Sequence, residues 1–437
     1  MKEQIKTILL AILVAGSLVQ SYLLAYSAPK FDAIVPSDND YVSSVLRGTP
    51  KEAAQLIHPK DIVIHFGNGE HTVLFPNMTF YRMILEMIRE RSFDGLKETD
   101  EVWQQWDGMD WIWPGIEIRF AEEMSQSLLQ PILPLEGADV PVETAVDRIR
   151  IVAVGEREEV KVLLQGSAGE RMQEVARADL TLEDVKRFVG FGETQIRYAP
   201  EGDHYLPVEP LPMSSYRLGY RLFTADQLRH NLFPDPSSTR NLRERDGSEI
   251  YTDGKRGLQI SADRRWIRYS DPAAPSEGAQ SAWETMLSAV QFVNRHGGWD
   301  GEYMLSAVKR NDEGNNEQTL QFRQYAGGYT GAYPILMLGD GNDFGTMALT
   351  LRNGVVTDYE RSLVQLTGET IATETDALLG GGALAEALTR YPDYLQVKDL
   401  YPAYVADISE ADVVLRPVWG LSMADGSYRT LPTGGVD

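Results

Sequence analysis

The hydrophobic positions of this chain form one long uninterrupted run and many short periodic stretches. The run extends from Ile5 to Tyr26, reads IKTILLAILVAGSLVQSYLLAY, and carries no charge after Lys6. As a helix it would be about 33 Å long, enough to cross a hydrocarbon core of roughly 30 Å. The later stretches alternate with the periods of strands and of amphipathic helices. The pattern therefore predicts a membrane segment followed by a mixed α and β part.

The first region after the apolar run alternates strands with helices. Asp61–Phe66 and His71–Phe75 flank Gly67-Asn68-Gly69, and an Asn-Gly pair between apolar runs is typical of a hairpin. Residues 79–91 have apolar side chains at helical spacing, and Thr181 to Asp184 form a capping box that opens another helix. Further strands are predicted at Gly115–Phe120, Arg148–Val154 and Val160–Leu164. The Gly- and Pro-rich stretch 190–212 indicates a boundary.

Two later regions share a plan of hairpin, strand and helix, which suggests a diverged internal duplication. In the first of them, capping boxes begin helices after Thr224 and Ser281. Its strands are predicted at 216–223, 249–252, 258–260 and 266–269. In the second, strands are predicted at 303–310, 320–325, 333–338, 346–351, 355–359, 405–408 and 412–419, with a helix at 383–390 and a last strand after Asp425-Gly426.

These elements predict an α+β protein of antiparallel sheets with packed helices behind a single N-terminal transmembrane helix. We expect a leader and anchor over 1–28, an N-terminal α/β domain over 29–200, a central α+β domain over 201–298 and a C-terminal α+β domain over 299–437. The duplication predicts that the last two domains resemble each other.

Charge sets the expected orientation of the anchor. Lys2 and Lys6 lie at its start, whereas the whole chain has a formal net charge of −23. The positive-inside bias therefore predicts a single-pass protein of the cell membrane. Its N-terminus would lie in the cytoplasm, and the residues after the anchor would lie outside the cell. A cleaved signal peptide is the alternative, because Ala25-Tyr26-Ser27 precedes Ala28 with small residues at suitable positions. A buried soluble helix is a third interpretation, against which the N-terminal lysines argue.

Composition excludes several classes of function. The 437 residues include no cysteine, which removes disulfides, thiol catalysis and cysteine-ligated metals and suits a bacterial cell envelope. The acidic balance argues against nucleic acid as a partner, because phosphate contact needs basic patches. No nucleophile elbow, phosphate-binding loop or dinucleotide fingerprint occurs in the sequence.

Three groups of residues could carry chemistry, and each has a simpler interpretation. His58, His65 and His71 could form a metal cluster, but they lack ligand spacing and are predicted to be partly exposed hairpin histidines. Asp340-Gly-Asn-Asp343 is predicted to be a polar turn rather than a calcium loop. The third group could form a sugar cleft or simply a tryptophan-rich loop. It comprises Asp107, Asp110 and Glu117 with Trp103, Trp106, Trp111 and Trp113. We therefore expect no catalytic residue, no metal and no cofactor.

The predicted anchor carries a packing pattern of its own. Small residues recur four apart in two series, and Gln20 is an amide within the span. The series are Thr7, Ala11, Ala15 and Ser17, Ser21, Ala25. Small residues at this spacing let helices approach closely in lipid, and a buried amide favours a hydrogen-bonding partner. The alternative is that such residues are simply frequent in membrane helices. A second copy of the chain, in a homodimer, is a further candidate partner.

The sequence resembles the YycH (WalH) family over nearly its whole length. The resemblance rests on the opening MKEQIKTILLAILVAGSLVQSYLLAY with Asp61-Ile-Val-Ile-His-Phe66, on FTADQLRHNLFPDPSS and DGSEIYTDGKRGLQIS, and on LQFRQYAGGYTGAYPIL, VVTDYERS and LRPVW near the end. It implies a membrane-anchored accessory protein of Gram-positive bacteria. With the related protein YycI, such proteins act on the sensor histidine kinase WalK (YycG), which governs cell-wall metabolism with its regulator WalR (YycF).

The resemblance also implies a fold and a mode of action. The last two domains should be similar to YycI, regulation should use transmembrane and ectodomain contacts, and no catalytic residue is carried over. An exported cell-wall-active hydrolase and a ligand-binding module remain the alternative functions.

Overall fold

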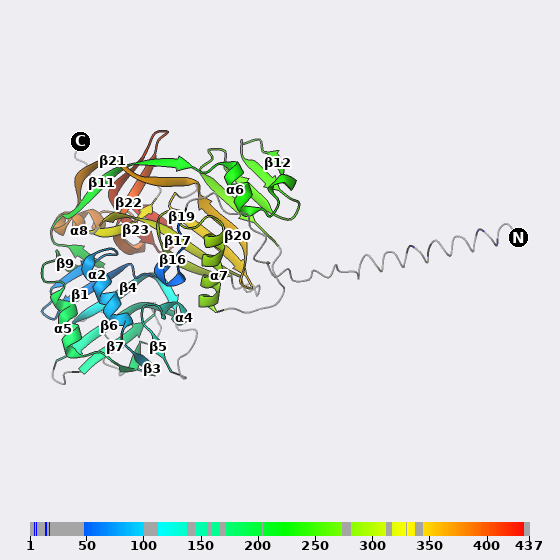
Figure 1. Ribbon diagram of the computed structural model, residues 1–437. Helices are drawn as coiled ribbons and strands as arrows, with labels where there is room; N and C mark the ends of the chain where they lie inside the picture. Colours follow the sequence, from blue (N-terminus) through cyan, green and yellow to red (C-terminus); the bar gives the residue numbers. More distant parts are fainter. Residues whose placement is uncertain are drawn as a thin grey trace. The chain divides into compact units, whose positions relative to one another are not determined.

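The computed structural model describes most of the chain after residue 47. The described residues are Gln4, Lys6, Val14, Ser17, 48–99, 112–137, 145–155, 159–166, 172–202, 204–272, 281–311, 317–328, 330–336 and 344–431. The chain divides into two units, Met1–Tyr41 and Val42–Asp437. The helices and strands labelled in Figure 1 belong to the second unit.

The predicted anchor Ile5–Tyr26 lies almost entirely outside the described residues. Lys6, Val14 and Ser17, the described members of the run, are helical and exposed. Within the described parts of the chain, no helix combines the length and apolar character that a membrane crossing needs. The anchor therefore stays a prediction.

The first half of the second unit forms a sheet of ten strands in the order β10-β9-β2-β1-β4-β6-β7-β8-β3-β5. The strands are β1 (Asp61–Phe66), β2 (His71–Leu74), β3 (Phe93–Glu98), β4 (Pro114–Ser125), β5 (Leu135–Glu136), β6 (Ala145–Val154), β7 (Glu159–Gln165), β8 (Gln173–Ala178), β9 (Arg197–Glu201) and β10 (His204–Pro207). The helices with this sheet are η1 (Ala53–Leu56), α2 (Thr79–Arg89), α4 (Gln126–Leu129) and α5 (Leu182–Gly190). Helix α5 begins at the predicted capping box of Thr181 and packs against β4, β1 and β6.

The second half forms a sheet of fourteen strands, in the order β12-β13-β14-β15-β20-β19-β17-β18-β22-β23-β11-β21, with β16 paired to β17 and β24 to β23. The strands are β11 (Leu211–Leu222), β12 (Arg240–Arg243), β13 (Glu249–Thr252), β14 (Gly257–Ile260), β15 (Trp266–Ser270), β16 (Glu302–Asn311), β17 (Glu317–Gly328), β18 (Gly331–Leu336), β19 (Thr346–Arg352), β20 (Val355–Ser362), β21 (Val364–Leu378), β22 (Val397–Ile408), β23 (Val413–Met423) and β24 (Tyr428–Thr430). The helices are α6 (Ala225–Leu232), η2 (Pro236–Ser238), α7 (Ala282–Arg295), α8 (Gly381–Thr389) and η3 (Tyr394–Gln396).

The two sheets share their hydrophobic core. One buried cluster runs from Leu56 of η1 to Leu349 of β19, and a second joins Val63 of β1 to Tyr404 of β22. The ring of Phe75, just after β2, lies 5.2 Å from that of Tyr333 on β18. Because neither cluster is confined to one sheet, burial of apolar surface stabilises the two halves together.

The segment before η1 is fastened to the second half of the chain. The Gly48 amide donates to the carbonyl of Gly297 at 2.8 Å, and Thr49 forms an isolated antiparallel bridge with the buried Trp299. Asn294 of α7 accepts from the Lys51 amide at 3.0 Å and donates to the Lys51 carbonyl at 2.8 Å. We call these contacts of residues 48–51 the entry clamp.

Most predicted elements are present, and several are longer than expected. The hairpin of β1 and β2 pairs His65 with His71 as its turn predicts, and the capping boxes at Thr224 and Ser281 begin α6 and α7. The described fold is mixed α+β and dominated by sheets, as expected. The stretch 190–212, predicted to be a boundary, contains β9 and β10, so the change from one sheet to the next falls between Pro207 and Leu211. The division into domains stays a prediction.

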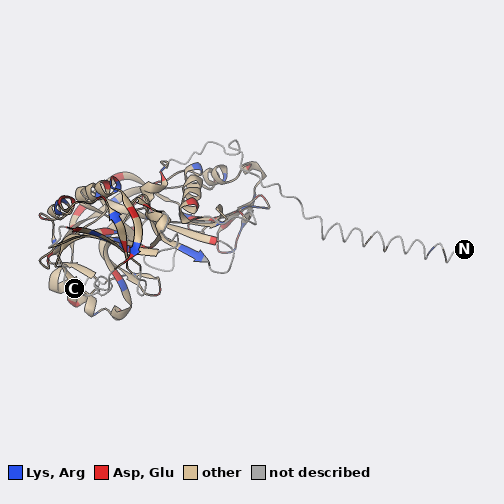
Figure 2. Cartoon of the chain, turned by 90° about the horizontal axis from the view of Figure 1, so that it is seen from below, with Lys and Arg blue, Asp and Glu red and all other residues tan. Residues whose placement is uncertain are grey.

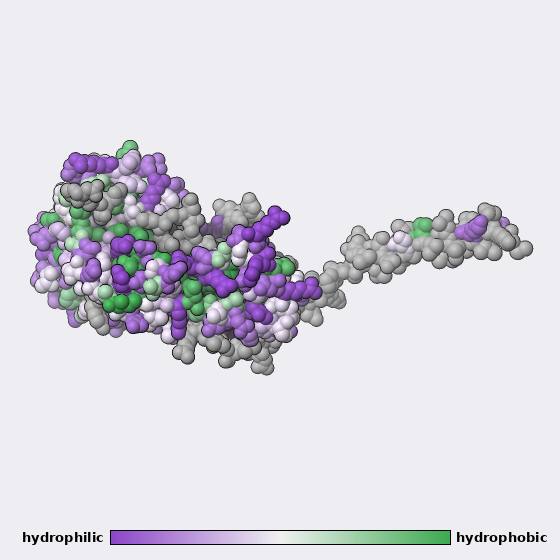
Figure 3. Space-filling view, turned by 90° about the horizontal axis from the view of Figure 1, so that it is seen from above, coloured by the Kyte–Doolittle hydropathy of each residue, from purple (hydrophilic) through white to green (hydrophobic). Residues whose placement is uncertain are grey.

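Charge and hydropathy are interspersed over the described surface. Figure 2 shows acidic and basic residues on neighbouring elements, and many form ion pairs, such as Arg352 with Glu317 at 2.8 Å. On the face in Figure 3, hydrophobic residues occur in separate patches among hydrophilic ones. On that face, therefore, no single apolar patch stands out as a functional site.

Candidate functional site

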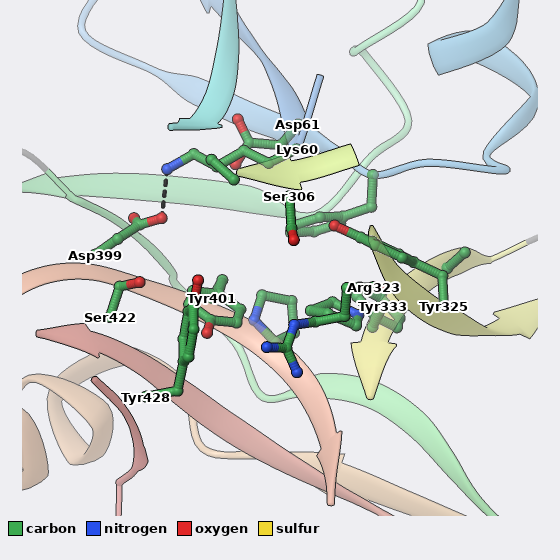
Figure 4. Close-up of a pocket in the computed structure, with 15 residues that line it drawn as sticks. Lys60, Asp61, Ser306, Arg323, Tyr325, Tyr333, Asp399, Tyr401, Ser422 and Tyr428 are labelled. Carbon is green, nitrogen blue, oxygen red and sulfur yellow. Dashed lines mark hydrogen bonds and ion pairs between the residues drawn. The ribbon is translucent and has the colours of Figure 1, made fainter. Parts of the chain in front are cut away.

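A cavity of about 50 Å³ lies where the two sheets meet (Figure 4). The first sheet contributes residues at the start of β1, after β2 and within β4, and the second contributes residues of β16, β17, β18, β22, β23 and β24. The lining residues are Lys60, Asp61, Phe75, Ala121, Ser306, Arg323, Tyr325, Ala332, Tyr333, Pro334, Asp399, Tyr401, Pro402, Ser422 and Tyr428. The cavity combines charged groups, hydroxyls and aromatic rings at one place, which is typical of a binding site.

An ion pair joins the two sheets at this cavity. The Lys60 ammonium lies 2.5 Å from a carboxylate oxygen of Asp399 on β22, and both side chains are 17% exposed. Burial alone would raise the pKa of Asp399, but the nearby cations Lys60 and Arg119 lower it below its usual value. Asp399 is therefore a carboxylate at neutral pH, and its charge is compensated across the junction.

Asp61 is held by a second, fully buried pair. Arg119 of β4 donates to both carboxylate oxygens of Asp61, at 2.7 and 2.8 Å, in the planar bidentate arrangement that suits a guanidinium. The guanidinium also lies over the ring of Tyr205 on β10, 5.3 Å from its centroid. Because its charge is matched by Arg119, Asp61 brings no net charge to the cavity.

The opposite part of the cavity is formed by β17, β22 and β24. Arg323 donates to the carbonyl of Ile335 at 3.1 Å, and its guanidinium lies 4.8 Å from the ring centroid of Tyr428. Burial raises the pKa of Tyr325 and of Tyr401, although the charge of Arg323 lowers both, so both hydroxyls stay protonated. This end of the cavity therefore presents hydrogen-bond donors.

The neighbouring strand leaves room for the ring of Tyr401. Gly420 of β23 pairs with Tyr401, and a Cβ at residue 420 would lie 2.8 Å from the ring. Only glycine leaves that space, so the packing of β22 on β23 fixes where the hydroxyl of Tyr401 points.

The prediction that His65 and His71 are partly exposed is wrong. His65 is 0% and His71 3% exposed, and their Nδ1 atoms are 2.8 Å apart. The hairpin of β9 and β10 covers them, and the Tyr205 ring lies 5.7 and 5.2 Å from the two imidazoles. Burial lowers the pKa of His65, although Glu117 raises it, so the imidazole is neutral. The sequence missed this because the covering strands come more than a hundred residues later.

The histidines do not assemble a metal site in the described chain. His58 is hydrogen-bonded through Nε2 to the carbonyl of Gln55, and burial lowers its pKa to about 4. Among the residues described, no three histidine, aspartate or glutamate side chains are grouped to hold a metal ion. His58 therefore makes a local hydrogen bond and does not join the other two histidines.

Glu117, the described carboxylate of the proposed sugar cleft, is 2% exposed and paired with Arg150 at 2.8 Å and Arg148 at 3.8 Å. Burial would raise its pKa, but the two arginines hold the pKa well below the usual range. Such a carboxylate cannot act as a general acid at neutral pH. Asp107, Asp110, Trp103, Trp106 and Trp111, and the stretch Asp340–Asp343, lie outside the described residues.

The predicted packing face of the anchor is described at one position. Ser17 is helical and exposed. The other members of that face, Thr7, Ala11, Ala15, Gln20, Ser21 and Ala25, lie outside the described residues, so the face stays a prediction.

The residues that form the cavity were not predicted from the sequence. Lys60 precedes β1, Arg323 lies on β17 and Asp399 on β22. Long stretches of chain separate these residues, and no spacing rule links them. Strand alternation gives no signal for Arg323, because this residue falls on the face opposite Leu320 and Phe322, where a polar side chain is ordinary.

Comparisons with known proteins agree along the whole chain. Family models described as the YycH protein N-terminal domain and C-terminal domain match residues 3–187 and 201–430. The chain is 20% identical over 445 residues to the two-component system WalR/WalK regulatory protein YycH of Bacillus subtilis (strain 168), covering 97% of this chain and 95% of that protein.

A solved structure gives the same assignment of fold. The crystal structure of YycH from Bacillus subtilis matches with a TM-score of 0.69 at 16% identity, covering 89% of this chain and 99% of that one. An uncharacterized protein from Eubacterium rectale reaches a TM-score of 0.34 at 13% identity, covering 55% and 87%, too low to indicate a common fold. On the family models, which together span most of its length, the chain belongs to the YycH family.

Proposed function

We propose that this protein is a membrane-anchored, extracytoplasmic regulator of a WalR/WalK-type two-component system that controls cell-wall metabolism. The observation that carries the proposal is the match over 97% of the chain to a relative named as a WalR/WalK regulatory protein. In this proposal the protein acts on the sensor histidine kinase by protein–protein contacts, with a protein related to YycI as a second partner.

The structure supports a binding role better than a hydrolytic one. A cell-wall hydrolase would need an accessible acid and base, and the described carboxylate that suggested one, Glu117, is buried between two arginines. The carboxylates at the cavity, Asp61 and Asp399, are also matched by cations. Side chains whose charges are already compensated stabilise a fold or an interface rather than transfer protons.

The apolar run supports a contact within the membrane. Ile5–Tyr26 presents small residues at a spacing that lets two helices approach closely, and Gln20 adds an amide. A hydrogen bond of this kind in lipid contributes roughly 0.6–2 kcal/mol, so it tunes association rather than creating it. Enlarging a small residue should therefore weaken the contact more than removing the amide.

The test is a kinase-dependent transcription reporter in cells whose own YycH-type protein has been deleted. We expect the full chain to restore regulation, Ala15→Leu and Ser21→Leu to abolish most of the effect, and Gln20→Leu to retain more of it. Ile12→Leu, which changes an apolar residue outside both small-residue series, is the control and should behave as the unsubstituted chain.

Membrane levels of each variant are measured in parallel, because leucine should not impair insertion. Equal regulation by all variants at equal levels would show that the helix is only a tether. Failure of the unsubstituted chain to restore regulation would contradict the proposed function itself.

A further inference from the structure

We propose that the cavity at the junction of the two sheets binds a small oxyanion, a phosphate or carboxylate group, through the guanidinium of Arg323. The site lies between β17, β22 and β24 and is assigned from the environment of this one arginine and from the hydroxyls around it. It goes beyond the proposed regulatory function and does not depend on it.

Arg323 differs from the other buried arginines of the protein. Arg119 lies 2.7 Å from Asp61, Arg150 lies 2.8 Å from Glu117, and Arg361 lies 2.6 Å from Asp300. Arg323 is also buried, at 8% exposed, yet the described residues place no carboxylate within ion-pair distance of it. A guanidinium stays charged at any physiological pH, and a buried charge without a counter-ion is unfavourable. An anion in the cavity would supply that counter-ion.

The hydrogen-bonding capacity of Arg323 is also largely unused by the described chain. A guanidinium has five N–H donors in a fixed fork, and the structure shows one donated, from Nη1 to the carbonyl of Ile335 at 3.1 Å. The Tyr428 ring stacks against the guanidinium, which leaves the edge of the fork open to a ligand. This fork matches the paired oxygens of a carboxylate or phosphate.

Hydroxyls complete a donor set around the guanidinium. Tyr325, Tyr401 and Tyr428 line the same cavity as Arg323, and the packing of Gly420 against the Tyr401 ring fixes the position of that side chain. Figure 4 shows the Lys60 ammonium directed at Asp399, so the two lining carboxylates are occupied by Lys60 and Arg119. Because each of those ion pairs has no net charge, the positive charge of Arg323 is the uncompensated charge among the described lining residues.

The size of the cavity limits the ligand to a small group. About 50 Å³ holds a few water-sized spheres at roughly 10–15 Å³ each, which suits one phosphate or carboxylate group and is too small for a nucleotide or a sugar ring. Tyr428 is 36% exposed, so the cavity reaches solvent beside β24. The group can therefore be a free ion or the end of a larger molecule.

The experiment measures anion binding to the purified full chain in detergent. Thermal unfolding is followed against increasing inorganic phosphate or acetate, with chloride at matched ionic strength, and dissociation constants are measured by calorimetry. We expect a saturable rise in melting temperature with at least one of the two oxyanions and none with chloride. The absence of any oxyanion-specific rise would overturn the proposal.

Variants locate the binding. Arg323→Gln should weaken binding at least 10-fold, Tyr401→Phe should weaken it several-fold, and Arg268→Gln, which removes an exposed arginine of β15, should leave it unchanged. Arg323→Lys keeps the charge without the fork and should bind with intermediate affinity, so the proposal remains testable if Arg323→Gln fails to fold. Undiminished binding in both Arg323 variants would contradict the assignment.

A comparison of free and substituted oxyanions shows whether the bound phosphate or carboxylate group is a free ion or part of a larger molecule. Methyl phosphate or propionate binding as tightly as the free ion would show that the site accepts the end of a larger molecule, whereas binding of the free ion alone would show a site for inorganic anions. Each result supports an oxyanion site. None requires the kinase, so failure here is separate from failure of the proposed function.

Discussion

Several buried ionisable side chains of the described chain, unlike Arg323, are either matched in charge or held neutral. Asp61, Glu117 and Asp300 each lie against an arginine, whereas the buried His65 and His296 have lowered pKa values because burial disfavours the imidazolium. The two groups respond differently to acid. Paired carboxylates resist protonation, and neutral buried histidines must take up a proton once the chain unfolds.

His296 makes this difference measurable. It is 3% exposed, and burial lowers its pKa from 6.5 to about 4, although its hydrogen bond to the carbonyl of Phe292 raises it. Below pH 6.5 the unfolded chain binds this proton more readily than the folded chain. The free energy of unfolding should therefore fall by about 2 kcal/mol between pH 7.5 and 5 through this residue alone.

The measurement is urea unfolding of the unsubstituted chain and of His296→Gln across that pH range. The variant should be less stable at pH 7.5, because its side chain no longer stacks on Phe292, but should show a shallower loss of stability with acid. Parallel pH profiles for the two chains would contradict the prediction. His230, which is exposed, provides the matched control as His230→Gln.

At the scale of elements, the sequence predicted what local patterns determine. The β1–β2 hairpin, the capped helices α5, α6 and α7, and the Asn353-Gly354 turn between β19 and β20 all follow from residues close together in the chain. Strand β21 was missed because its residues 367–377 are exposed on both faces, so its side chains show no alternation. Its pairing with the distant β11 determines that it is a strand.

The cavity was missed for a related reason. Its charged residues become neighbours only when β1, β17 and β22 meet, and strand order between remote segments is not written in any local pattern. The same holds for the burial of His65 and His71, which depends on the pairing of β9 with β2 and on the Tyr205 ring of β10. A functional site can be predicted from a sequence when its residues lie at a characteristic spacing along the chain. Here the residues of the site become neighbours only through tertiary packing.

Packing between β22 and β23 predicts the effect of adding one methyl group. At Gly420 a Cβ would lie 2.8 Å from the Tyr401 ring and 3.1 Å from Leu336, so Gly420→Ala should reduce the free energy of unfolding by about 1–3 kcal/mol. At Gly382 in α8 no described atom lies within 4 Å of that position. Gly382→Ala should therefore be neutral or stabilising by up to about 1 kcal/mol.

Chemical unfolding of both variants tests this. The comparison separates a steric effect from a general effect of replacing glycine, because both changes add the same group. Equal stability of the two variants would show that the Tyr401 ring moves aside freely.

At the scale of the molecule, the two sheets share buried clusters and contact each other at the cavity. Hydrophobic clusters run through both, and Lys60 and Asp399 join them at the cavity. In the proposed function the two sheets lie outside the cell, attached through the apolar run at the N-terminal end of the chain.

The orientation is testable with reporters fused after Asp437. An alkaline phosphatase fusion should be active and a green fluorescent protein fusion dark, because the positive-inside bias of Lys2 and Lys6 predicts a cytoplasmic N-terminus. The full-length mass of the membrane-bound protein is the control, since a mature chain beginning at Ala28 would identify a cleaved signal peptide. A fluorescent fusion would reverse the proposed topology.

The entry clamp determines how a pull on the N-terminal side would be distributed. Residues 48–51 are bonded to Asn294 of α7 and to Gly297 and Trp299 in the segment between α7 and β16. Tension arriving at Gly48 would therefore load α7 and the segment before β16 first, and β1, with Lys60 and Asp61 beside the cavity, would bear it only after those bonds broke. The entry clamp would therefore act as a mechanical anchor point. A force on the N-terminal segment would leave the residues that line the cavity in place as long as the clamp holds.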